Sequence, residues 1–316
     1  MNKLTVINNQ AVNVIQNIPV TAEEITKHFI DSQDVKPSSK ALYTRTLRQY
    51  FNWINNAGLL QKDITRKDVL QYKEELLGGG HSPLTVGSYL TVVRKFYAFA
   101  EANKYYYNVA KEIKTPKKNE LFEKEILSDT EGIALNSWAQ SKSLRDRAIV
   151  NLIQNTGLRC IEVIRANIED LTLRNGKRVL LIQGKGRDAK DQLVVLTDSA
   201  YKPIADYLAI RAKVKTNEPL FISSSNNSKG HRLTTRFVSG LIKDGLKSIG
   251  LNDRRYTAHS LRHTVGSKIY AITGRIDQVQ TALRHSSPVT SQIYARKAIK
   301  DASINNNPLE LLEGLF

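Results

Sequence analysis

Four short segments of the chain contain residue types that phosphoryl transfer requires. Arg159 follows a Thr-Gly pair in TGLRCIEV, and Arg262 lies far downstream in HSLRHT. Lys185 lies between them in a Gly-Lys-Gly-Arg turn, and Tyr294 follows His285 by nine residues in LRHSSPVTSQIYAR. Together these segments offer two guanidinium groups, an amine, several imidazoles and a phenol.

Attack on a phosphodiester needs a nucleophile, groups that hold the charge of the nonbridging oxygens, and an acid for the departing oxygen. The planar fork of arginine donates two parallel hydrogen bonds to phosphate, so two arginines from different elements can clamp one phosphate. Lysine or histidine can protonate the departing 5′ oxygen. A tyrosine phenol can form a covalent phosphotyrosine without a metal, and this bond retains the energy needed for rejoining, so no cofactor is expected.

Each of these residues has an ordinary interpretation when it is taken alone. An arginine after Thr-Gly and a lysine between glycines are usually solvated, and a tyrosine in a polar helix is usually half-buried. A His-x-x-Arg pair on a helix is usually structural or exposed. The combined order and spacing favours the catalytic interpretation, and His259, Arg262 and His263 at i, i+3 and i+4 can share one helix face.

The elements that must position these residues are helices and one hairpin. Valine, leucine and isoleucine are frequent in 178–183 and in 192–196, on either side of the glycine-bearing turn, and this pattern predicts a strand pair. Apolar residues at helical spacing predict the remaining elements of this half. We expect helices over 146–154, 159–166, 198–213, 233–249, 259–273 and 275–283.

Helical patterns also dominate the first third of the chain. The ranges 38–56, 65–77 and 82–103 show apolar stripes, with Thr65 and Ser82 as predicted N-caps. We expect a first domain of about four helices that ends near residue 113.

A chain of 316 residues suits two domains. The polar and basic segment KTPKKNELFEK is typical of a linker between domains. The sequence therefore predicts a mainly α protein with a small antiparallel β-sheet. Its expected parts are a flexible N-terminal arm (1–20), a helical domain (21–113), a linker (114–124), a second domain (125–300) and a C-terminal tail (301–316).

The composition favours a polyanionic partner. Lysine and arginine number 47 against 30 acidic residues, which gives a net charge of +17 that is spread over both halves. Such a surplus is typical of proteins that bind nucleic acid or an anionic membrane. No apolar run approaches the ~18 residues of a membrane span, and the N-terminus lacks the pattern of a signal peptide. We therefore expect a soluble, cytoplasmic protein that binds nucleic acid.

The order of these motifs resembles the signature of the tyrosine recombinases, also called the phage integrase family. TGLRCIE is similar to the family's Thr-Gly-(Leu/Met)-Arg-x-x-Glu block, and HSLRHT is similar to its His-x-Leu-Arg-His-(Thr/Ser) block. GKGRDAKDQLVVL resembles the family's Gly-Lys-Gly hairpin, and LRHSSPVTSQIYAR resembles its block that ends in the tyrosine. The resemblance covers about residues 21–300. It implies a core-binding (SAM-like) domain and a catalytic domain that form a C-shaped clamp on the duplex.

The resemblance also implies a role for each matching residue. Arg159 and Arg262 would clamp the scissile phosphate, and Tyr294 would attack it to form a 3′-phosphotyrosyl bond. Lys185 would be the general acid for the 5′ hydroxyl. Lys190 is a second lysine in the hairpin, but Lys185 is preferred because of its Gly-Lys-Gly setting.

Five further residues belong to the matching blocks. His259 and His285 would hydrogen-bond the phosphate or assist proton transfer. Glu162 would orient Arg159 or brace the fold, and His263 would pack structurally. Cys160, the single cysteine, is interpreted as a small buried filler, and one cysteine excludes both a disulfide framework and a Cys-rich zinc site.

One position departs clearly from the family pattern. The family usually has glycine directly before its second histidine, where this chain has Arg284. This arginine could contact DNA or protein, or it could point outward.

Basic and polar side chains on both halves are candidate DNA contacts, although any one of them could equally belong to a solvated helix face. Most such contacts bind phosphate and position the protein. The candidates are Lys40, Arg45, Arg48, Thr85, Arg94, Lys95, Arg187, Lys229, His231, Arg232, Arg254 and Arg255.

Taken alone, the short apolar C-terminal segment could fold back on its own domain. By analogy with the family, the side chains Leu309, Leu311, Leu312, Leu315 and Phe316 would dock into a neighbour in a tetramer on two DNA sites. About 20 residues precede the first helix, which favours a simple Xer-like recombinase over a lambda-like integrase. The alternatives are a type IB topoisomerase-like relaxing enzyme and an inactive DNA-binding accessory factor. Integration or excision of a mobile element and dimer resolution all stay open.

Overall fold

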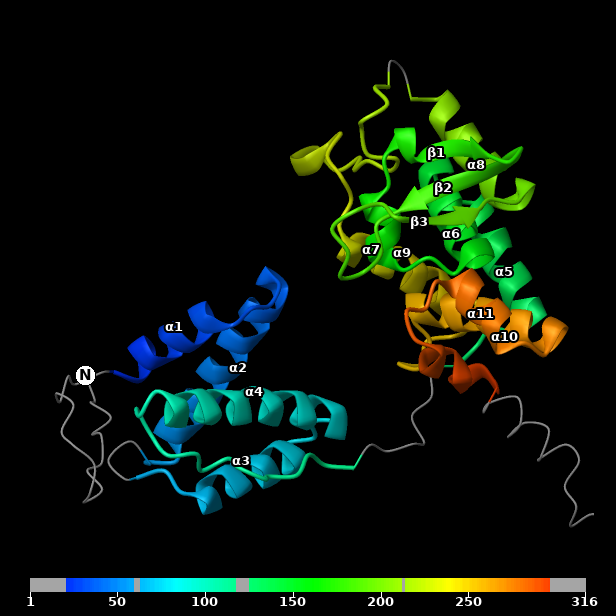
Figure 1. Ribbon diagram of the computed structural model, residues 1–316. Coiled ribbons are helices and arrows are strands. Elements are labelled where there is room, and N and C mark those ends of the chain that lie inside the picture. Colours follow the sequence, from blue (N-terminus) through cyan, green and yellow to red (C-terminus); the bar gives the residue numbers. More distant parts are fainter. Residues whose placement is uncertain (1–20, 60–62, 118–124, 212–213, 296–316) are drawn as a thin grey trace, which may run out of the picture. The chain divides into compact units, whose positions relative to one another are not determined.

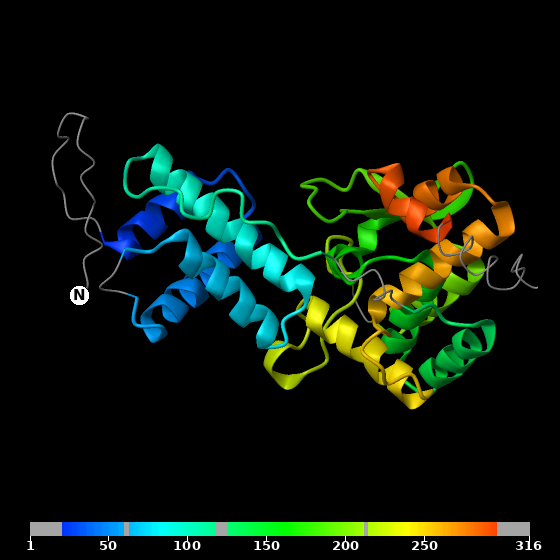
Figure 2. The same ribbon diagram turned by 90° about the horizontal axis from the view of Figure 1, so that it is seen from below.

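The computed structural model describes residues 21–59, 63–117, 125–211 and 214–295. The chain divides into two compact units, residues 1–121 and 122–316, and the boundary falls within the predicted linker 114–124. Both units are mainly helical and the second contains a small antiparallel sheet, which confirms the predicted fold class (Figures 1 and 2). The predicted arm 1–20 and tail 301–316 lie outside the described residues.

The first unit consists of four helices among its described residues, as the sequence predicts. Thr65 and Asp68 form a capping box at the start of the third helix, and the Ser82 side chain caps the fourth. The helices are α1 (Ala22–Ser32), α2 (Pro37–Asn56), α3 (Arg66–Gly78) and α4 (Pro83–Ala102).

Aromatic side chains fill the core of this unit. Phe29 of α1 meets Phe96 of α4 edge to face, with ring centroids 5.8 Å apart. Tyr50 of α2 and Tyr97 of α4 are buried, and their hydroxyls lie 3.0 Å apart in a hydrogen bond. Because a buried hydroxyl needs a partner, this bond fixes the register of α2 against α4.

The second unit is built around α6 (Leu144–Thr156), which packs against five other helices of the unit. Leu152 and Ile153 of α6 are fully buried in the main apolar cluster. The other helices are α5 (Asp129–Gln140), α7 (Cys160–Arg165), α8 (Asp198–Ala209), α9 (Thr235–Ser248), α10 (Ala258–Thr273) and α11 (Ile276–Leu283).

The sheet has three antiparallel strands in the order β1-β2-β3, which are β1 (Leu171–Arg174), β2 (Lys177–Ile182) and β3 (Gln192–Val195). The predicted pair is β2 and β3, whereas β1 was not predicted. Asn175 and Gly176 connect β1 to β2 with φ of 49° and 73°. An Asn-Gly pair in this conformation is the strongest short signal for a two-residue hairpin, so the sequence did contain the evidence for β1.

The end of the described chain lies against α10 and α11. Val279, Leu283 and Tyr294 form a separate buried cluster, with Val265 and Ile269 of α10 packed against it. No helix among the described residues is long and apolar enough to cross a membrane.

Candidate active site

Arg159 lies directly before α7 and is held there by Glu162. The carboxylate of Glu162 accepts a hydrogen bond from the backbone N–H of Arg159 at 2.9 Å and from its Nη1 at 2.7 Å. The Glu162 side chain is fully buried, while that of Arg159 is 27% exposed. Glu162 therefore both caps α7 and aims the Arg159 guanidinium, because one carboxylate binds the two ends of the same residue.

Arg262 projects from α10 and is almost completely buried, at 1% exposure. Its Nη1 donates to the carbonyl of Gly157 at 2.7 Å, and its Nη2 donates to the carbonyl of Leu283. Gly157 ends α6 with φ of 62°, a conformation that brings this carbonyl within reach. Burial, together with the positive charge of Arg159, lowers the pKa of Arg262 to about 10, so the group stays cationic at neutral pH.

Tyr294 packs into a niche on α10 and is only 4% exposed. A Cβ added at Gly266 would lie 2.5 Å from Cζ of the Tyr294 ring, so glycine is required for this close approach. Burial raises the pKa of Tyr294 to about 12, although the nearby charges of Arg262 and Arg159 act in the opposite direction. The phenol is therefore protonated at neutral pH.

Two histidine rings lie beside that of Tyr294, and a third contacts one of them. The ring of His285 lies parallel to that of Tyr294, and its Nδ1 is 2.7 Å from the hydroxyl of Ser291. The ring of His263 lies 5.7 Å from that of Tyr294, and His259 meets His263 edge to face at 4.6 Å. Burial, followed by the charge of Arg262, lowers the pKa of His285 to about 4, so this imidazole is neutral at pH 7.

The two hairpin lysines have different environments. Lys190 forms an ion pair with the buried carboxylate of Asp170, with Nζ and Oδ2 2.7 Å apart. Lys185 is exposed and lines a pocket of about 170 Å³ together with Arg159 and His285. The lysine that faces the arginine and histidine is therefore Lys185, while Lys190 anchors the hairpin to the loop before β1.

Arg284 lines the same pocket, and its side chain is only 5% exposed. The interpretation in which it points outward is therefore wrong. Its backbone has φ of 55° and ψ of 46°, the left-handed conformation that glycine adopts without strain. The family glycine and this arginine therefore suit the same backbone.

Several candidate DNA contacts have bonds within their own unit. Arg94 donates to the carbonyl of Ile113, and Arg232 donates to the carbonyls of Ile164 and Ala166. In a similar way, other candidates bond to nearby groups, namely Lys40 to the Asp31 carbonyl, Lys95 to the Tyr43 hydroxyl, Arg187 to Asp191, Arg255 to Glu125 and Asp253, and Thr85 to Ser82. The remaining candidates are exposed, namely Arg45, Arg48, Lys229, His231 and Arg254.

Sequence reasoning missed three supporting residues. Ser291 holds His285, Gly266 makes room for the Tyr294 ring, and Thr290 lines the pocket. Ser291 and Thr290 lie on the helical segment after His285 and Gly266 lies on α10, so their proximity to the site is visible only once helices are placed. Cys160 is half-buried against the main apolar cluster, and burial raises the pKa of its thiol.

The arrangement suits chemistry on an anionic phosphate. Arg159, Lys185, Arg187 and Arg284 bring four cationic groups to one pocket, while His285 in its lining stacks against Tyr294 and is affected by the charge of Arg262. Fixed cations in a partly buried site stabilise charge that develops on a reacting group. In the part of the chain that the structure describes, histidine, cysteine and acidic side chains form no cluster that could hold a metal ion.

Comparison with known proteins identifies the family. Residues 125–300, more than half of the chain, match the phage integrase family, and residues 27–104 match the phage integrase N-terminal SAM-like domain. A tyrosine recombinase XerC of Caldanaerobacter subterraneus subsp. tengcongensis is 35% identical over 182 residues, which are 55% of this chain and 48% of that protein. A tyrosine recombinase XerC of Thermodesulfovibrio yellowstonii is 27% identical over 268 residues, covering 82% of this chain and 85% of that protein.

Solved structures share the fold. A XerH site-specific recombinase bound to palindromic difH substrate has a TM-score of 0.73 at 22% identity, covering 92% of this chain and 85% of that chain. A lambda integrase dimer bound to a core site has a TM-score of 0.65 at 16% identity, covering 86% of this chain and 97% of that chain. Family match and fold agree, and the chain therefore belongs to the phage integrase family as a tyrosine recombinase.

Proposed function

We propose that this recombinase cleaves and rejoins double-stranded DNA at specific sites through a 3′-phosphotyrosyl intermediate on Tyr294. The observation that carries this proposal is the convergence of Arg159, Lys185 and His285 on one pocket, with the Tyr294 ring parallel to His285 behind it. A relaxing enzyme would use the same chemistry without pairing two sites, so joining between two DNA molecules separates the two activities.

In the proposed reaction, the Tyr294 oxygen attacks phosphorus, its proton passes to the neutral imidazole of His285, and the bond from phosphorus to the 5′ oxygen breaks. Lys185, on the exposed turn, donates a proton to that departing oxygen. Arg159 and Arg262 hold the nonbridging oxygens, and both are fixed beforehand by Glu162 and by backbone carbonyls. Rejoining is the reverse reaction, in which a 5′ hydroxyl of the partner strand displaces the tyrosine.

The histidines have supporting roles in this scheme. His285 is neutral at pH 7, so it contributes a hydrogen bond rather than a positive charge. His259 is exposed at the start of α10 and is the second candidate for a bond to the phosphate. His263 packs between the His259 and Tyr294 rings and holds the two together.

DNA binding is proposed to involve both units. The side chains offered for phosphate contact are the exposed cations Arg45, Arg48, Lys229 and Arg254 with His231. Because arginines such as Arg94 and Arg232 already bond backbone carbonyls, their first role is to brace the fold. Such a protein acts in the cytoplasm, on a mobile element or in dimer resolution.

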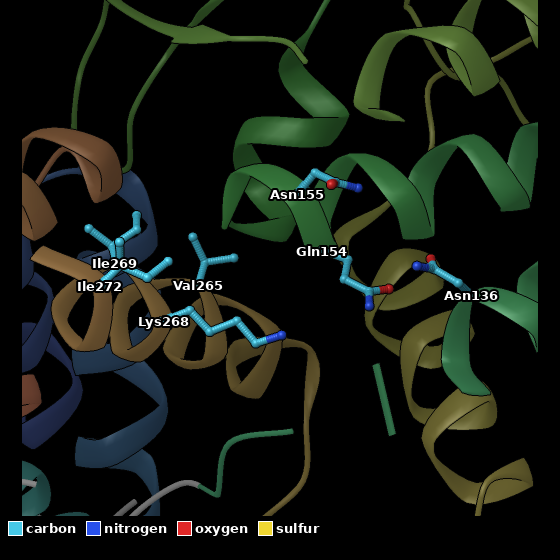
Figure 3. Close-up of a pocket in the computed structure, with 7 residues that line it drawn as sticks. All are labelled: Asn136, Gln154, Asn155, Val265, Lys268, Ile269 and Ile272. Carbon is cyan, nitrogen blue, oxygen red and sulfur yellow. The ribbon is translucent and has the colours of Figure 1, made fainter. Parts of the chain in front are cut away.

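Assembly is proposed to occur through the C-terminal segment 301–316 of a neighbouring protomer, in a tetramer on two sites. A pocket of about 310 Å³ lies between α5, α6 and α10 (Figure 3). Ile272 is 84% exposed at this pocket, and the buried acceptors Asn136 Oδ1 and Gln154 Oε1 have no hydrogen-bond partner among the described residues. An apolar segment with free backbone N–H groups would satisfy both features.

Two experiments test these proposals. A nicked suicide substrate, which traps the cleaved state, should give a covalent adduct with the wild-type protein, and Tyr294→Phe should give none. An adduct with that variant would exclude Tyr294 as the nucleophile. For assembly, Ile272→Asp should lower the proportion of tetramer on paired sites in sedimentation, and an unchanged proportion would exclude this pocket.

A further inference from the structure

Arg284 occupies a position at which a long charged side chain is unexpected. It ends α11 in the left-handed conformation, with φ of 55°, which costs a non-glycine residue roughly 1–2 kcal/mol. Its side chain nevertheless turns inward and is 5% exposed, lining the pocket with Arg159, Lys185 and His285. Strain of this kind persists where the side chain has a use.

The hydrogen-bonding capacity of Arg284 is only partly used. Nη1 donates to the carbonyl of Ala282 at 2.7 Å. Nε and Nη2 are buried without a hydrogen-bond partner in the described ranges, and the carboxylate of Glu162 lies 3.7 Å from Nη2, too far for a hydrogen bond. A buried guanidinium with open donors is costly unless an acceptor fills the site.

The excess of positive charge around Arg284 also favours binding of an anion. Glu162 is paired with Arg159 and lies near Arg284, and its negative charge is felt by Arg262 as well. One carboxylate therefore serves three guanidinium groups, and the cations Lys185 and Arg187 line the pocket beside Arg159 and Arg284. An excess of at least two positive charges in a partly buried site favours a phosphate group.

We propose that Arg284 is a third phosphate-binding arginine of this recombinase, whose Nε and Nη2 donate to a nonbridging oxygen of the scissile phosphate. This inference rests on the proposed function of the pocket. It assigns a direct contact with the reacting group to the residue at which the chain departs most clearly from the family pattern.

The test compares Arg284→Gly with the wild-type protein on two suicide substrates. One substrate has a normal scissile phosphate, and the other has a neutral methylphosphonate at that position. Glycine keeps the left-handed backbone, so the variant should fold. We expect adduct formation to slow by about 10- to 100-fold on phosphate and by less than about threefold on methylphosphonate, since the charge that Arg284 holds is then missing. An equal loss on both substrates would show that Arg284 only braces Glu162, and no loss on phosphate would also overturn the inference.

A second measurement does not depend on cleavage. Inorganic phosphate should raise the unfolding temperature of the wild-type protein more than that of Arg284→Gly. Arg178→Met is the matched control, because Arg178 pairs with Asp198 on the surface of β2. It should respond to phosphate as the wild-type protein does, and equal responses of all three proteins would contradict the phosphate contact.

Adduct formation by the wild-type and Tyr294→Phe proteins on the phosphate substrate distinguishes failure of the Arg284 contact from failure of the proposed function. An adduct with wild type, none with Tyr294→Phe and full activity of Arg284→Gly would refute only the role of Arg284. An adduct with Tyr294→Phe would instead refute the proposed function.

Discussion

The rings of His285 and Tyr294 lie parallel, with 6° between their planes and 6.3 Å between their centroids. Burial acts on the two groups in opposite directions, lowering the pKa of His285 to about 4 and raising that of Tyr294 to about 12. Both groups are consequently neutral at physiological pH. The positive charge of the site therefore resides on arginines and Lys185, and the phenol must lose its proton during the attack.

The depressed pKa of His285 predicts a dependence of stability on pH. The folded protein resists protonation of this ring until about pH 4, whereas the unfolded chain is protonated near the ordinary value of 6.5. The unfolded state therefore binds more protons in that window, so stability is full above pH 6.5 and falls as the pH drops towards 4. Thermal unfolding should show a steeper decline between pH 7 and 5 for the wild-type protein than for His285→Gln, and parallel declines would contradict the neutral buried ring.

Replacing Lys185 should affect the rate of cleavage, whereas replacing Lys190 should affect the stability of the protein. Lys185→Ala should slow adduct formation by about 10²- to 10⁴-fold and leave the unfolding temperature unchanged, because Lys185 is exposed. Lys190→Ala should lower the free energy of unfolding by about 1–3 kcal/mol, because it removes the ion-pair partner of the buried Asp170 carboxylate.

A substrate with sulfur in place of the 5′ oxygen identifies the acid. The thiolate leaves without protonation, so this substrate should restore the cleavage rate of Lys185→Ala. Failure to restore it, or restoration of Lys190→Ala alone, would point away from Lys185 as the proton donor.

Gly266 should be indispensable for seating the nucleophile. A methyl group there would lie 2.5 Å from Tyr294 Cζ and 2.8 Å from Leu283 Cδ1, so the tyrosine must move. Gly266→Ala should destabilise the protein by about 1–3 kcal/mol and slow adduct formation. Gly240→Ala is the matched control, because a Cβ there meets no atom within 4 Å. Helix propensity favours alanine at both positions, so equal effects of the two substitutions would contradict the steric contact with Tyr294.

Salt dependence should report the contribution of α2 to DNA binding. Arg45 and Arg48 are exposed, so each can neutralise one phosphate. Replacing both with alanine should reduce the slope of log affinity against log salt by about 2. Fluorescence anisotropy over a range of salt concentrations measures this slope. A slope equal to that of Arg178→Ala would show that α2 does not contact DNA.

The sequence predicted most helices because apolar residues recur with helical spacing and because Thr65 and Ser82 cap their helices as expected. It also predicted the catalytic candidates, since order and spacing restrict chemistry more than any single residue does. The strand β1 was missed because it is only four residues long, although its apolar and polar residues alternate and Asn175-Gly176 marked the hairpin.

The directions in which individual side chains point could not be predicted from the sequence. Arg94 and Arg232 look like DNA contacts in the chain, yet their partners are backbone carbonyls distant in sequence. Arg284 turns inward because its backbone is left-handed and Glu162 lies beneath it, and neither fact follows from neighbouring residues.

The most direct test of the account is to identify the residue that carries the DNA. The covalent adduct formed on a suicide substrate should be digested with protease and nuclease, and the modified peptide sequenced by mass spectrometry. We predict a peptide that contains Tyr294 linked to the 3′ phosphate of the cleaved strand. Linkage through any other residue, or to a 5′ phosphate, would contradict the account.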